Sequence, residues 1–355
     1  MRKSLMRLTL RQLQIFHEVC DLRSYSRAAE EMSLTQPAVS LQIRQLEELI
    51  GQPLFDYVGK KLYMTEAAEA LQRASRDIFG RLENLDMQLS DMQGSLQGQL
   101  KLAVESSAKY FVPHLFAAFK RQHPEVQLHL TVVNRAQVIR RLSDNRDDLV
   151  IMSMVPQDMG LEFLPFLNNP IVAVALPDHP LSLQGPLRLQ DLEPYTLLIR
   201  EPGSGTRLAC EEYFKEKRVH FTQTVEVASA EAQRECVVAG LGVALLTRHA
   251  LNLELATGGL KELPVEELPL YRSWCLVQAK AKRLSPVAHA FLGFIRSERV
   301  QISALAERFA GQPRVPAIGV PGNHCCSGAT GALRNGLRWR DGTPCGAGLP
   351  ADDGS

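Results

Sequence analysis

The sequence predicts an α/β protein that begins with an all-α helix-turn-helix unit, continues through one long helix, and ends in two α/β subdomains. Three observations predict this arrangement. Residues 24–48 carry apolar positions at helical spacing around a turn signal, residues 66–93 carry a heptad-like apolar series, and strand-like and helix-like segments alternate over residues 99–296. A chain of 355 residues with 45% hydrophobic content is long and apolar enough for two or three domains.

Segment 24–48 predicts two short helices joined by a turn at Ser33 and Leu34. Thr35 is expected to be the N-cap of the second helix, because its hydroxyl can accept an unpaired N–H of the first helical turn. Pro37 falls in that first turn, where its missing N–H has no cost.

The second helix of this pair has two distinct faces. Its apolar residues recur at helical spacing and should pack inward: Val39, Ile43, Leu46 and Ile50. Another face carries side chains that suit the major groove of DNA: Gln36, Pro37, Ser40 and Arg44. Thr35, at the start of the helix, is also expected to contact DNA. This is the pattern of a recognition helix, although the spacing alone is equally consistent with a helical hairpin in an ordinary core.

The formal net charge is only +1, so DNA binding would depend on a local basic patch. Basic residues gather in and around the predicted helix-turn-helix: Arg2, Lys3, Arg7, Arg11, Arg23, Arg27, Arg44, Lys60 and Lys61. Acidic residues are interspersed among them, which leaves a mixed solvated surface as the alternative.

Two β-prone arms around Gly59 predict a hairpin wing over residues 54–64. Lys60 and Lys61 lie at its tip, where they would reach phosphates and position the protein without reading sequence. We include both, together with Arg27, among the expected DNA contacts.

A single long helix is predicted from Thr65 to Gln93. Its apolar residues are spaced seven, four, three, four and three apart, as in the seam of a coiled coil: Leu71, Ile78, Leu82, Leu85, Leu89 and Met92. The alternative is a helix that packs on its own core. We favour a homodimer through residues 66–93, because a narrow seam between two domains needs an outside partner. Two recognition helices on a two-fold axis would bind a pseudo-palindromic site in double-stranded DNA.

Beyond a glycine-containing linker, alternating segments predict a largely parallel sheet with a ligand cleft between two subdomains. The expected strands are 99–104, 126–133, 149–152, 161–166, 171–176, 195–199, 224–227, 243–246 and 272–278. The expected helices are 107–122, 136–145, 206–217, 230–239, 248–256 and 287–296.

These segments define the expected domains: a winged helix-turn-helix over residues 1–65, a linker helix over 66–94, and a ligand-binding domain over 95–310. Within the ligand-binding domain, subdomain I would span about 95–169 and 269–300, and subdomain II about 170–268.

Residues 311–355 are rich in Gly and Pro without apolar periodicity, which predicts a disordered tail. The tail residues His324, Cys325, Cys326 and Cys345 fit no standard zinc spacing, so no metal site is expected.

The segment 197–207 predicts an anion site. A strand ends, two glycines allow close backbone approach, and a helix begins with free N–H groups and hydroxyl donors. The candidates there are Arg200, Ser204, Gly205, Thr206 and Arg207. Strand ends in the first subdomain would face them with Ser106, Ser107, Asn134 and Arg135. The alternative is a tight strand-to-helix turn with a serine cap.

Several function classes are not supported by motifs. The chain has no GxxxxGK[ST], HExxH or GxSxG motif, so neither an enzyme nor a bound cofactor is expected. No apolar run is long enough for a membrane span and no secretory signal opens the chain, so we expect a cytoplasmic protein. Scattered cysteines predict buried reduced thiols. The alternatives are a redox sensor using Cys210 and Cys236, and a binding protein of transport type.

Several stretches resemble the DNA-binding domain of LysR-type transcriptional regulators: Leu10-Arg-Gln-Leu13, Ala28-Ala29, Leu34-Thr-Gln-Pro-Ala-Val-Ser40, Leu46-Glu47 and Leu54-Phe55. Others are similar to the branch that controls Calvin-cycle (RuBisCO) operons: Lys109-Tyr-Phe-Val-Pro113, Asn134-Arg135, Arg200-Glu-Pro-Gly-Ser-Gly-Thr-Arg207 and Lys282-Arg-Leu-Ser-Pro286. The chain departs from the family at Tyr57, near which a basic residue is usual, and at Ala68, near which a glycine is usual.

The resemblance implies a periplasmic-binding-protein-like effector domain and a homotetramer. It also implies a small anionic effector, such as a phosphorylated sugar, phosphoenolpyruvate or NADPH, and a regulator that mainly activates.

Overall fold

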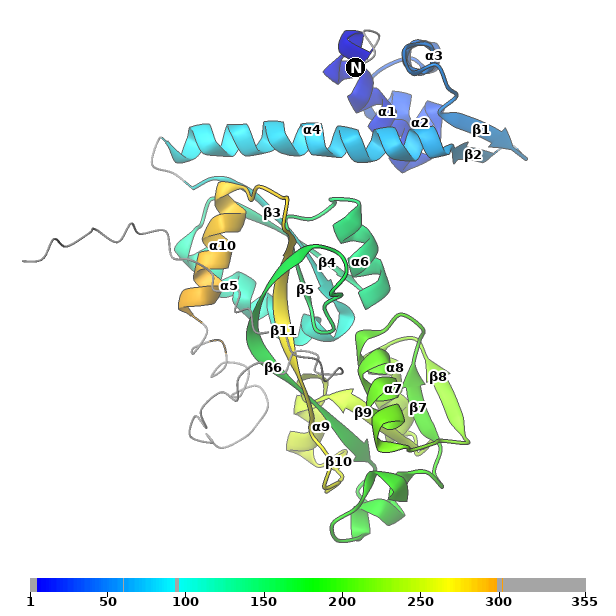
Figure 1. The fold of residues 1–355 in the computed structure, drawn as a ribbon, viewed down its shortest axis with the longest axis vertical. Coiled ribbons are helices and arrows are strands. Elements are labelled where there is room, and N and C mark those ends of the chain that lie inside the picture. Colours follow the sequence, from blue (N-terminus) through cyan, green and yellow to red (C-terminus); the bar gives the residue numbers. More distant parts are fainter. Residues whose placement is uncertain (1–4, 60, 93–95, 299–301, 303–355) are drawn as a thin grey trace, which may run out of the picture. The chain divides into compact units, whose positions relative to one another are not determined.

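The computed structural model describes residues 5–59, 61–92, 96–298 and 302. Three helices form the N-terminal unit: α1 (Leu10–Leu22), α2 (Tyr25–Glu31) and α3 (Gln36–Ile50), preceded by a short 3₁₀ turn, η1 (Leu5–Arg7) (Figure 1). Their apolar faces close around one core that includes Phe16, Ile43 and Leu46. Ser33 lies in the turn between α2 and α3, where the sequence predicts a turn, and it takes a left-handed conformation at φ 54°.

The start of α3 differs from the prediction in one detail. Thr35 has the extended backbone of an N-cap, but its side chain makes no capping hydrogen bond. An N-cap side chain accepts from the second or third helical residue, and Pro37 in the second position has no N–H to donate. At the other end, α3 stops at Gly51, which adopts the left-handed conformation that favours glycine.

The predicted wing is present as an antiparallel hairpin of β1 (Phe55–Val58) and β2 (Lys61–Met64), in which Val58 pairs with Lys61. Tyr57 is exposed on β1, and its ring stacks on Tyr25 with 6.3 Å between centroids. The hairpin is therefore braced against α2. Lys60 lies outside the described residues.

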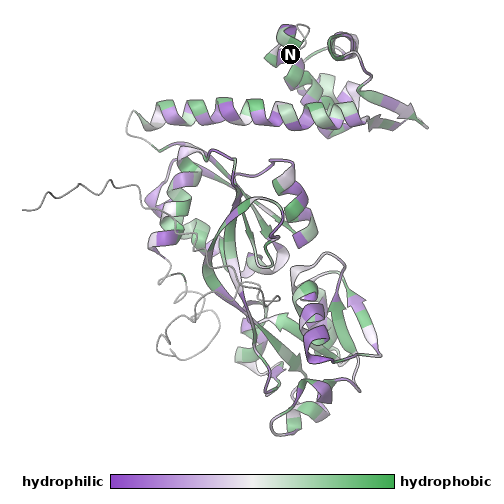
Figure 2. Ribbon diagram, in the orientation of Figure 1, coloured by the Kyte–Doolittle hydropathy of each residue, from purple (hydrophilic) through white to green (hydrophobic). Residues whose placement is uncertain are grey.

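The long helix is α4 (Glu66–Asp91), capped by Thr65, whose side chain accepts the Ala68 N–H. Leu71 packs against the N-terminal core. The remaining seam residues are uncovered in a single chain, with exposed fractions from 40% to 85%: Ile78, Leu82, Leu85, Leu89 and Met92. Figure 2 shows apolar and polar residues alternating along this helix. An apolar stripe of this kind requires a partner to cover it.

The C-terminal part is built on one mixed sheet with the strand order β4-β3-β5-β11-β6-β9-β7-β8, to which β10 adds beside β6. The strands are β3 (Gly98–Glu105), β4 (Val126–Val133), β5 (Leu149–Met152), β6 (Leu161–Ala175), β7 (Leu197–Arg200), β8 (Thr224–Val227), β9 (Val243–Thr247), β10 (Lys261–Glu262) and β11 (Leu270–Ala279). The trios β4-β3-β5 and β9-β7-β8 are each parallel, while β6 and β11 run antiparallel to each other between them.

Strand β6 corrects the sequence prediction. Segments 161–166 and 171–176 are predicted as separate strands, yet they form one continuous strand that includes Pro165 and Pro170. The register against β11 shifts between Trp274 and Cys275, a β-bulge that lies beside Pro165. The bulge absorbs the irregularity and lets the strand cross the whole domain.

The helices are α5 (Val112–Gln122), α6 (Arg135–Ser143), α7 (Gly205–Lys217), α8 (Ala230–Val238), α9 (Asn252–Thr257) and α10 (Pro286–Ser297). Two predicted helices are each divided. Segment 107–122 begins as a 3₁₀ turn, η2 (Ser106–Tyr110), before α5, because Pro113 cannot lie inside a continuous helix. Segment 248–256 divides into the turn η5 (Arg248–Ala250) and α9. Two further 3₁₀ turns are η3 (Pro180–Leu183) and η4 (Leu189–Leu192).

The two parallel trios belong to separate hydrophobic cores. One core joins β3, β5 and β11 to α5 and α10 and contains Phe119, Trp274 and Phe291. The second joins β6, β7 and β9 to α7 and contains Phe214 and Leu245. Strands β6 and β11 contribute to both cores. They run between the two trios (Figure 1). The described helices include none that is long and apolar enough to cross a membrane.

Replacing Leu85 and Leu89 together by Lys is expected to lower the oligomeric state of the protein without unfolding the chain, because both side chains are exposed in one protomer and would be buried between two. Sedimentation velocity measures the change. The matched control replaces Leu183 and Leu253, which are exposed elsewhere. An unchanged sedimentation coefficient for the Leu85/Leu89 variant would place the dimer contact on another surface.

Candidate functional site

The structure presents the predicted recognition face on α3. Thr35, Gln36, Pro37 and Arg44 are exposed and Ser40 is half-buried. The opposite side of the helix is in the core, where Val39, Ile43 and Leu46 are fully buried. The polar face is therefore free to enter a major groove.

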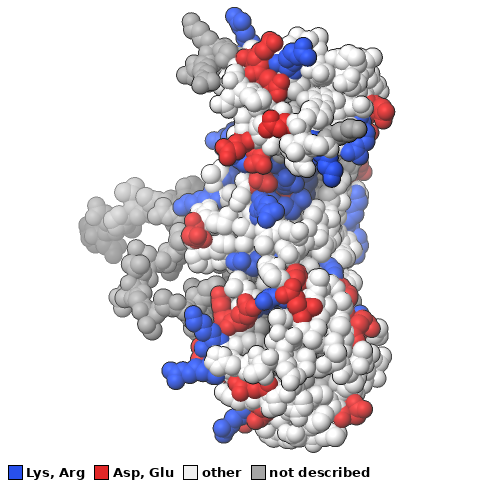
Figure 3. All heavy atoms as spheres, turned by 90° about the vertical axis from the view of Figure 1, so that its right-hand side faces the viewer, with Lys and Arg blue, Asp and Glu red and all other residues white. Residues whose placement is uncertain are grey.

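The predicted phosphate contacts are less uniform. The guanidinium of Arg27 donates to the carbonyl of Leu22 at the end of α1, where a positive charge stabilises the helix C-terminus. Arg27 thus has a structural partner that the sequence did not predict. Lys61 is exposed on the wing. Acidic and basic side chains are mixed over the face in Figure 3, in keeping with the near-neutral net charge.

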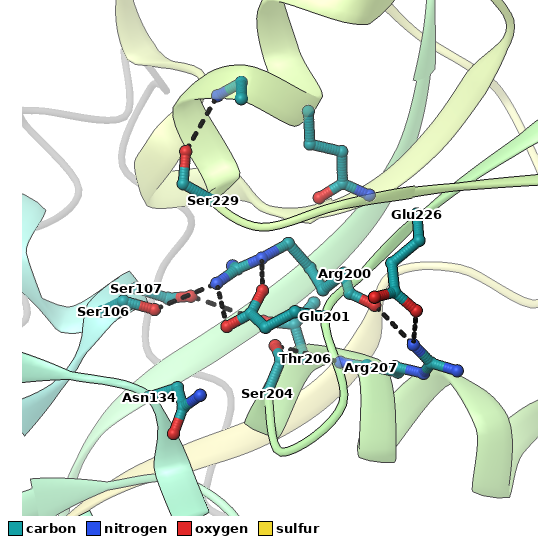
Figure 4. Close-up of polar contacts among 12 residues, drawn as sticks. Ser106, Ser107, Asn134, Arg200, Glu201, Ser204, Thr206, Arg207, Glu226 and Ser229 are labelled. Carbon is teal, nitrogen blue, oxygen red and sulfur yellow. Dashed lines mark hydrogen bonds and ion pairs between the residues drawn. The ribbon is translucent and has the colours of Figure 1, made fainter. Parts of the chain in front are cut away.

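The predicted effector residues lie at a junction between the two parallel trios, where β3 and β7 end. We call this the subdomain junction; it comprises Ser106, Ser107, Arg200, Ser204 and Thr206 (Figure 4). Hydrogen bonds cross it directly. Ser107 Oγ lies 3.4 Å from Thr206 Oγ1, and Arg200 Nη2 donates to Ser106 Oγ over 3.2 Å. The hydroxyl groups expected to line an open cleft are in contact with one another.

Backbone groups close the junction on a second side. The N–H of Ala136, at the start of α6, donates to the carbonyl of Gly203 over 3.1 Å. Gly203 has φ 87°, and a Cβ there would lie 2.9 Å from the Cβ of Ala136. Glycine is required at this position by both the backbone conformation and the close approach.

Arg200 is the central charged group of the junction. Its side chain is only 2% exposed, and two of its nitrogens bind the Glu201 carboxylate at 2.8 and 3.1 Å. Its remaining nitrogen, Nη1, is buried without a hydrogen-bond partner. Unpaired buried N–H groups are costly, so this nitrogen is a ready donor for an anion that enters the junction.

Arg207 does not belong to this group. Its guanidinium binds Glu211 at 2.7 Å and Glu226 at 2.8 Å, and it donates to the Arg200 carbonyl. These carboxylates hold the pKa of Arg207 above its ordinary value. Figure 4 shows the side chain directed away from Ser106 and Ser107. Sequence reasoning placed it in the anion site because the pairing with Glu226, on β8, cannot be read from local spacing.

Three other predicted residues are engaged by local hydrogen bonds at the junction. Ser204 caps α7 by accepting the Arg207 N–H, and Asn134 caps α6 by accepting the Gln137 N–H at 3.0 Å. Arg135 Nε donates to the carbonyl of Met154 over 2.7 Å. These residues form the helix starts that surround the junction.

Sequence reasoning missed Glu105, the last residue of β3. Its carboxylate is buried and accepts the Ser153 N–H at 3.1 Å and the Ser153 hydroxyl at 3.2 Å. Burial raises the pKa of Glu105 to about 7. A Cβ on Gly205 would lie 2.5 Å from Glu105 Oε2, so the carboxyl group lies directly against the first turn of α7. The available signal was an acid directly after the apolar run Leu102-Ala103-Val104.

A second missed contact joins the two sides of the junction. Tyr110 Oη donates to Glu231 at 2.9 Å, and Lys109 forms an ion pair with the same carboxylate. Lys109 and Tyr110 lie in η2, whereas Glu231 lies in the first turn of α8. The Lys109 ammonium group helps to lower the pKa of Glu231, against the effect of burial.

The redox alternative is not supported by the thiols. Cys210 is buried, which raises its pKa to about 12, so almost none is thiolate near neutral pH. Within the described ranges, no cluster of three His, Cys, Asp or Glu side chains could hold a metal ion. The tail residues His324, Cys325, Cys326 and Cys345 lie outside those ranges.

Comparison with known proteins identifies the family. Residues 93–299 match the LysR substrate binding domain, and residues 10–69 match the bacterial regulatory helix-turn-helix protein, lysR family. The chain is 42% identical over 292 residues to the RuBisCO operon transcriptional regulator of Acidithiobacillus ferrooxidans, covering 82% of this chain and 94% of the relative. It is 39% identical to the HTH-type transcriptional activator CmpR of Synechocystis sp., covering 84% of this chain and 98% of CmpR.

A solved structure of a regulatory domain is also similar to this chain. The regulatory domain of Synechocystis PCC6803 CcmR in complex with 2-PG is 36% identical, with a TM-score of 0.55, and covers 57% of this chain and 97% of that domain. The chain belongs to the LysR family of transcriptional regulators, with an N-terminal DNA-binding unit and an effector-binding domain. The resemblance seen in the sequence is thereby confirmed.

Replacing Gly205 by Ala is expected to destabilise the closed junction. The new methyl group would overlap Glu105 Oε2, and the hydrogen bonds from Ser153 keep that carboxyl group from moving freely. The free energy of unfolding should fall by about 1–3 kcal/mol, as for other overpacked buried sites. Urea unfolding measures it.

Gly293→Ala is the matched control, because a Cβ on Gly293 meets nothing within 4 Å and the residue lies in α10. It should be neutral or slightly stabilising. Equal stabilities for the two variants would show that Glu105 and Gly205 are not packed as described.

Proposed function

We propose that this LysR-family regulator binds a pseudo-palindromic operator as a homotetramer and changes its hold on that DNA when a small anionic metabolite binds at the subdomain junction. The observation that carries the proposal is the buried Arg200 guanidinium, whose Nη1 has no partner and whose neighbours are serine and threonine hydroxyls. A phosphate group offers the acceptors that these donors lack.

The relatives narrow the chemistry of the effector. The CcmR regulatory domain was solved with 2-PG, and two similar proteins are a RuBisCO operon regulator and the activator CmpR. We propose that 2-phosphoglycolate or another phosphorylated metabolite of carbon fixation is the effector, and that the target is an operon of that metabolism, which the protein mainly activates.

We assign one function to each of the three domains predicted from the sequence. We propose that residues 1–65 bind DNA, that residues 66–94 form the dimer, and that residues 95–310 bind the effector. The subdomains on either side of the junction would be residues 95–169 with 269–300, and residues 170–268. No step of this function needs catalysis, so we propose that the chain is not an enzyme; because its target is DNA, we propose that it acts in the cytoplasm.

The mechanism is a population shift. The junction residues bond to one another, so an anion must take over contacts such as the one from Arg200 to Ser106. It can shift the regulator only by its different affinities for two arrangements of the subdomains. A thermal-shift panel of 2-phosphoglycolate, sugar phosphates, phosphoenolpyruvate and NADPH identifies the effector, since a ligand of the native state raises the melting temperature.

Gln36→Ala should lower affinity for the operator more than affinity for unrelated DNA. A bidentate base contact contributes about 1–3 kcal/mol of discrimination, whereas phosphate contacts are common to all sequences. Fluorescence anisotropy with competitor DNA at fixed salt gives both affinities. Gln88→Ala, on the exposed surface of α4, is the matched control. Losses of the same size on both DNAs would refute base reading by Gln36.

Thr206→Ala should weaken effector binding about 10- to 150-fold, the factor that corresponds to a lost hydrogen bond to a charged group. Operator binding without effector should be unchanged. Calorimetry measures the first and anisotropy the second. Thr257→Ala is the control, since its hydroxyl donates to the carbonyls of Leu253 and Glu254 within α9. An effector affinity equal to that of the parent protein would remove Thr206 from the site.

A further inference from the structure

Glu105 places a carboxyl group at the subdomain junction, where an anion would be stabilised by positive charge. It ends β3, it is buried, and its Oε2 lies against the start of α7, close enough that a Cβ on Gly205 would overlap it. Ser106, which follows it, accepts the hydrogen bond from Arg200. The same few residues therefore hold both the donors for an anion and a buried acid.

The positive and negative charges of four side chains, Arg135, Arg200, Glu105 and Glu201, are equal in number only when Glu105 is ionised. The charged groups that act on Glu105 are Arg135, at the start of α6, and Arg200, at the end of β7. Glu201 binds Arg200. With Glu105 ionised, two guanidinium groups face two carboxylates. With Glu105 protonated, one positive charge is left for a ligand.

The hydrogen bonds to Glu105 suit either protonation state. Ser153 donates its N–H to one oxygen, and its hydroxyl lies 3.2 Å from the other. That hydroxyl donates to a carboxylate and can accept from a carboxylic acid. Glu105 therefore keeps Ser153 as its hydrogen-bond partner in both protonation states, and the Ser153 hydroxyl changes from donor to acceptor when the charge is lost.

We propose that Glu105 is the proton-linked selectivity residue of the junction: a dianionic group binds when this carboxyl group is protonated, and the proton is taken up from solvent. The inference rests on the proposed function, since it assigns the anion to this junction. An ionised Glu105 repels the anion in a water-poor site, whereas the protonated form leaves the Arg200 guanidinium to dominate. The regulator would then respond to pH as well as to its effector.

The sign of the pH dependence follows from the burial of Glu105. Its pKa is raised from 4.5 to about 7, so the protein without ligand holds the proton below pH 7 and loses it above. Anion affinity should be constant below about pH 7 and should fall about tenfold for each pH unit above it.

Inorganic sulfate is the probe, because it carries the same charge throughout the range from pH 6 to 9, whereas a phosphate ester itself titrates near pH 6. Calorimetry on the full-length protein at constant ionic strength gives the affinity. Repeating it in two buffers of different ionisation enthalpy counts the protons. At pH 8 the parent protein should take up close to one proton for each sulfate bound.

Glu105→Gln should bind sulfate with an affinity that does not depend on pH, about tenfold tighter than the parent at pH 8, and with no proton uptake. Gln keeps the shape of Glu and can still accept from Ser153. The matched control is Glu262→Gln: burial also raises the pKa of Glu262, but this residue lies on β10, where it pairs with Arg248. That variant should keep the parent pH profile.

Measurements on Thr206→Ala distinguish failure of the anion site from failure of the proton linkage at Glu105. If it weakens sulfate binding while Glu105→Gln leaves the pH profile unchanged, the anion site stands and the proton linkage is wrong. If Thr206→Ala has no effect, or if sulfate binds to none of the proteins, the junction is not an anion site and both proposals fail.

Discussion

The antiparallel pairing of β6 and β11 is the constraint on which the effector-binding domain depends. These two strands share a register from Leu161 opposite Ala279 to Ile171 opposite Leu270. One parallel trio attaches to β11 and the other to β6. Because both trios are anchored to the same pair, the ends of β3 and β7 face each other, and the helix starts of α6 and α7 meet at the junction.

A junction of this kind places charged groups in a buried setting, where each needs a partner. Arg200 is paired with Glu201. Two groups are not fully compensated: Arg200 retains an unbonded Nη1, and Glu105 is buried without a direct ion pair in the described structure. Incomplete compensation is costly for stability and is typical of sites where a ligand completes the network.

Contacts across the junction explain how ligand binding is coupled to the rest of the protein. Contacts such as Ser107 to Thr206 and Tyr110 to Glu231 connect the two sides directly. A ligand that replaces some of them changes the relative stability of the closed arrangement. Two-state coupling of this form needs only a difference in affinity between the arrangements.

Local features of the fold could be predicted from the sequence, and features that depend on distant partners could not. The faces of α3 and the exposed seam of α4 follow from periodicity within one helix, and the structure agrees with both. The continuity of β6 depends on a bulge formed with β11. The pairing of Arg207 depends on β8, and the role of Arg27 depends on the end of α1.

The candidate site shows the same division. Ser106, Ser107 and Thr206 were predicted from strand ends and helix starts, because those positions are set by the local chain. Glu105 was missed, since its burial is produced by Gly205 and Ser153 from other elements. The assignment of the effector residues and of the domain boundaries stays a prediction.

A crystal structure of the protein with 2-phosphoglycolate tests the central claim most directly. We predict that the phosphate group lies within hydrogen-bonding distance of Arg200 Nη1 and of the Thr206 hydroxyl. A phosphate bound elsewhere, with Arg200 Nη1 still lacking a partner, would contradict the assignment of the junction as the effector site.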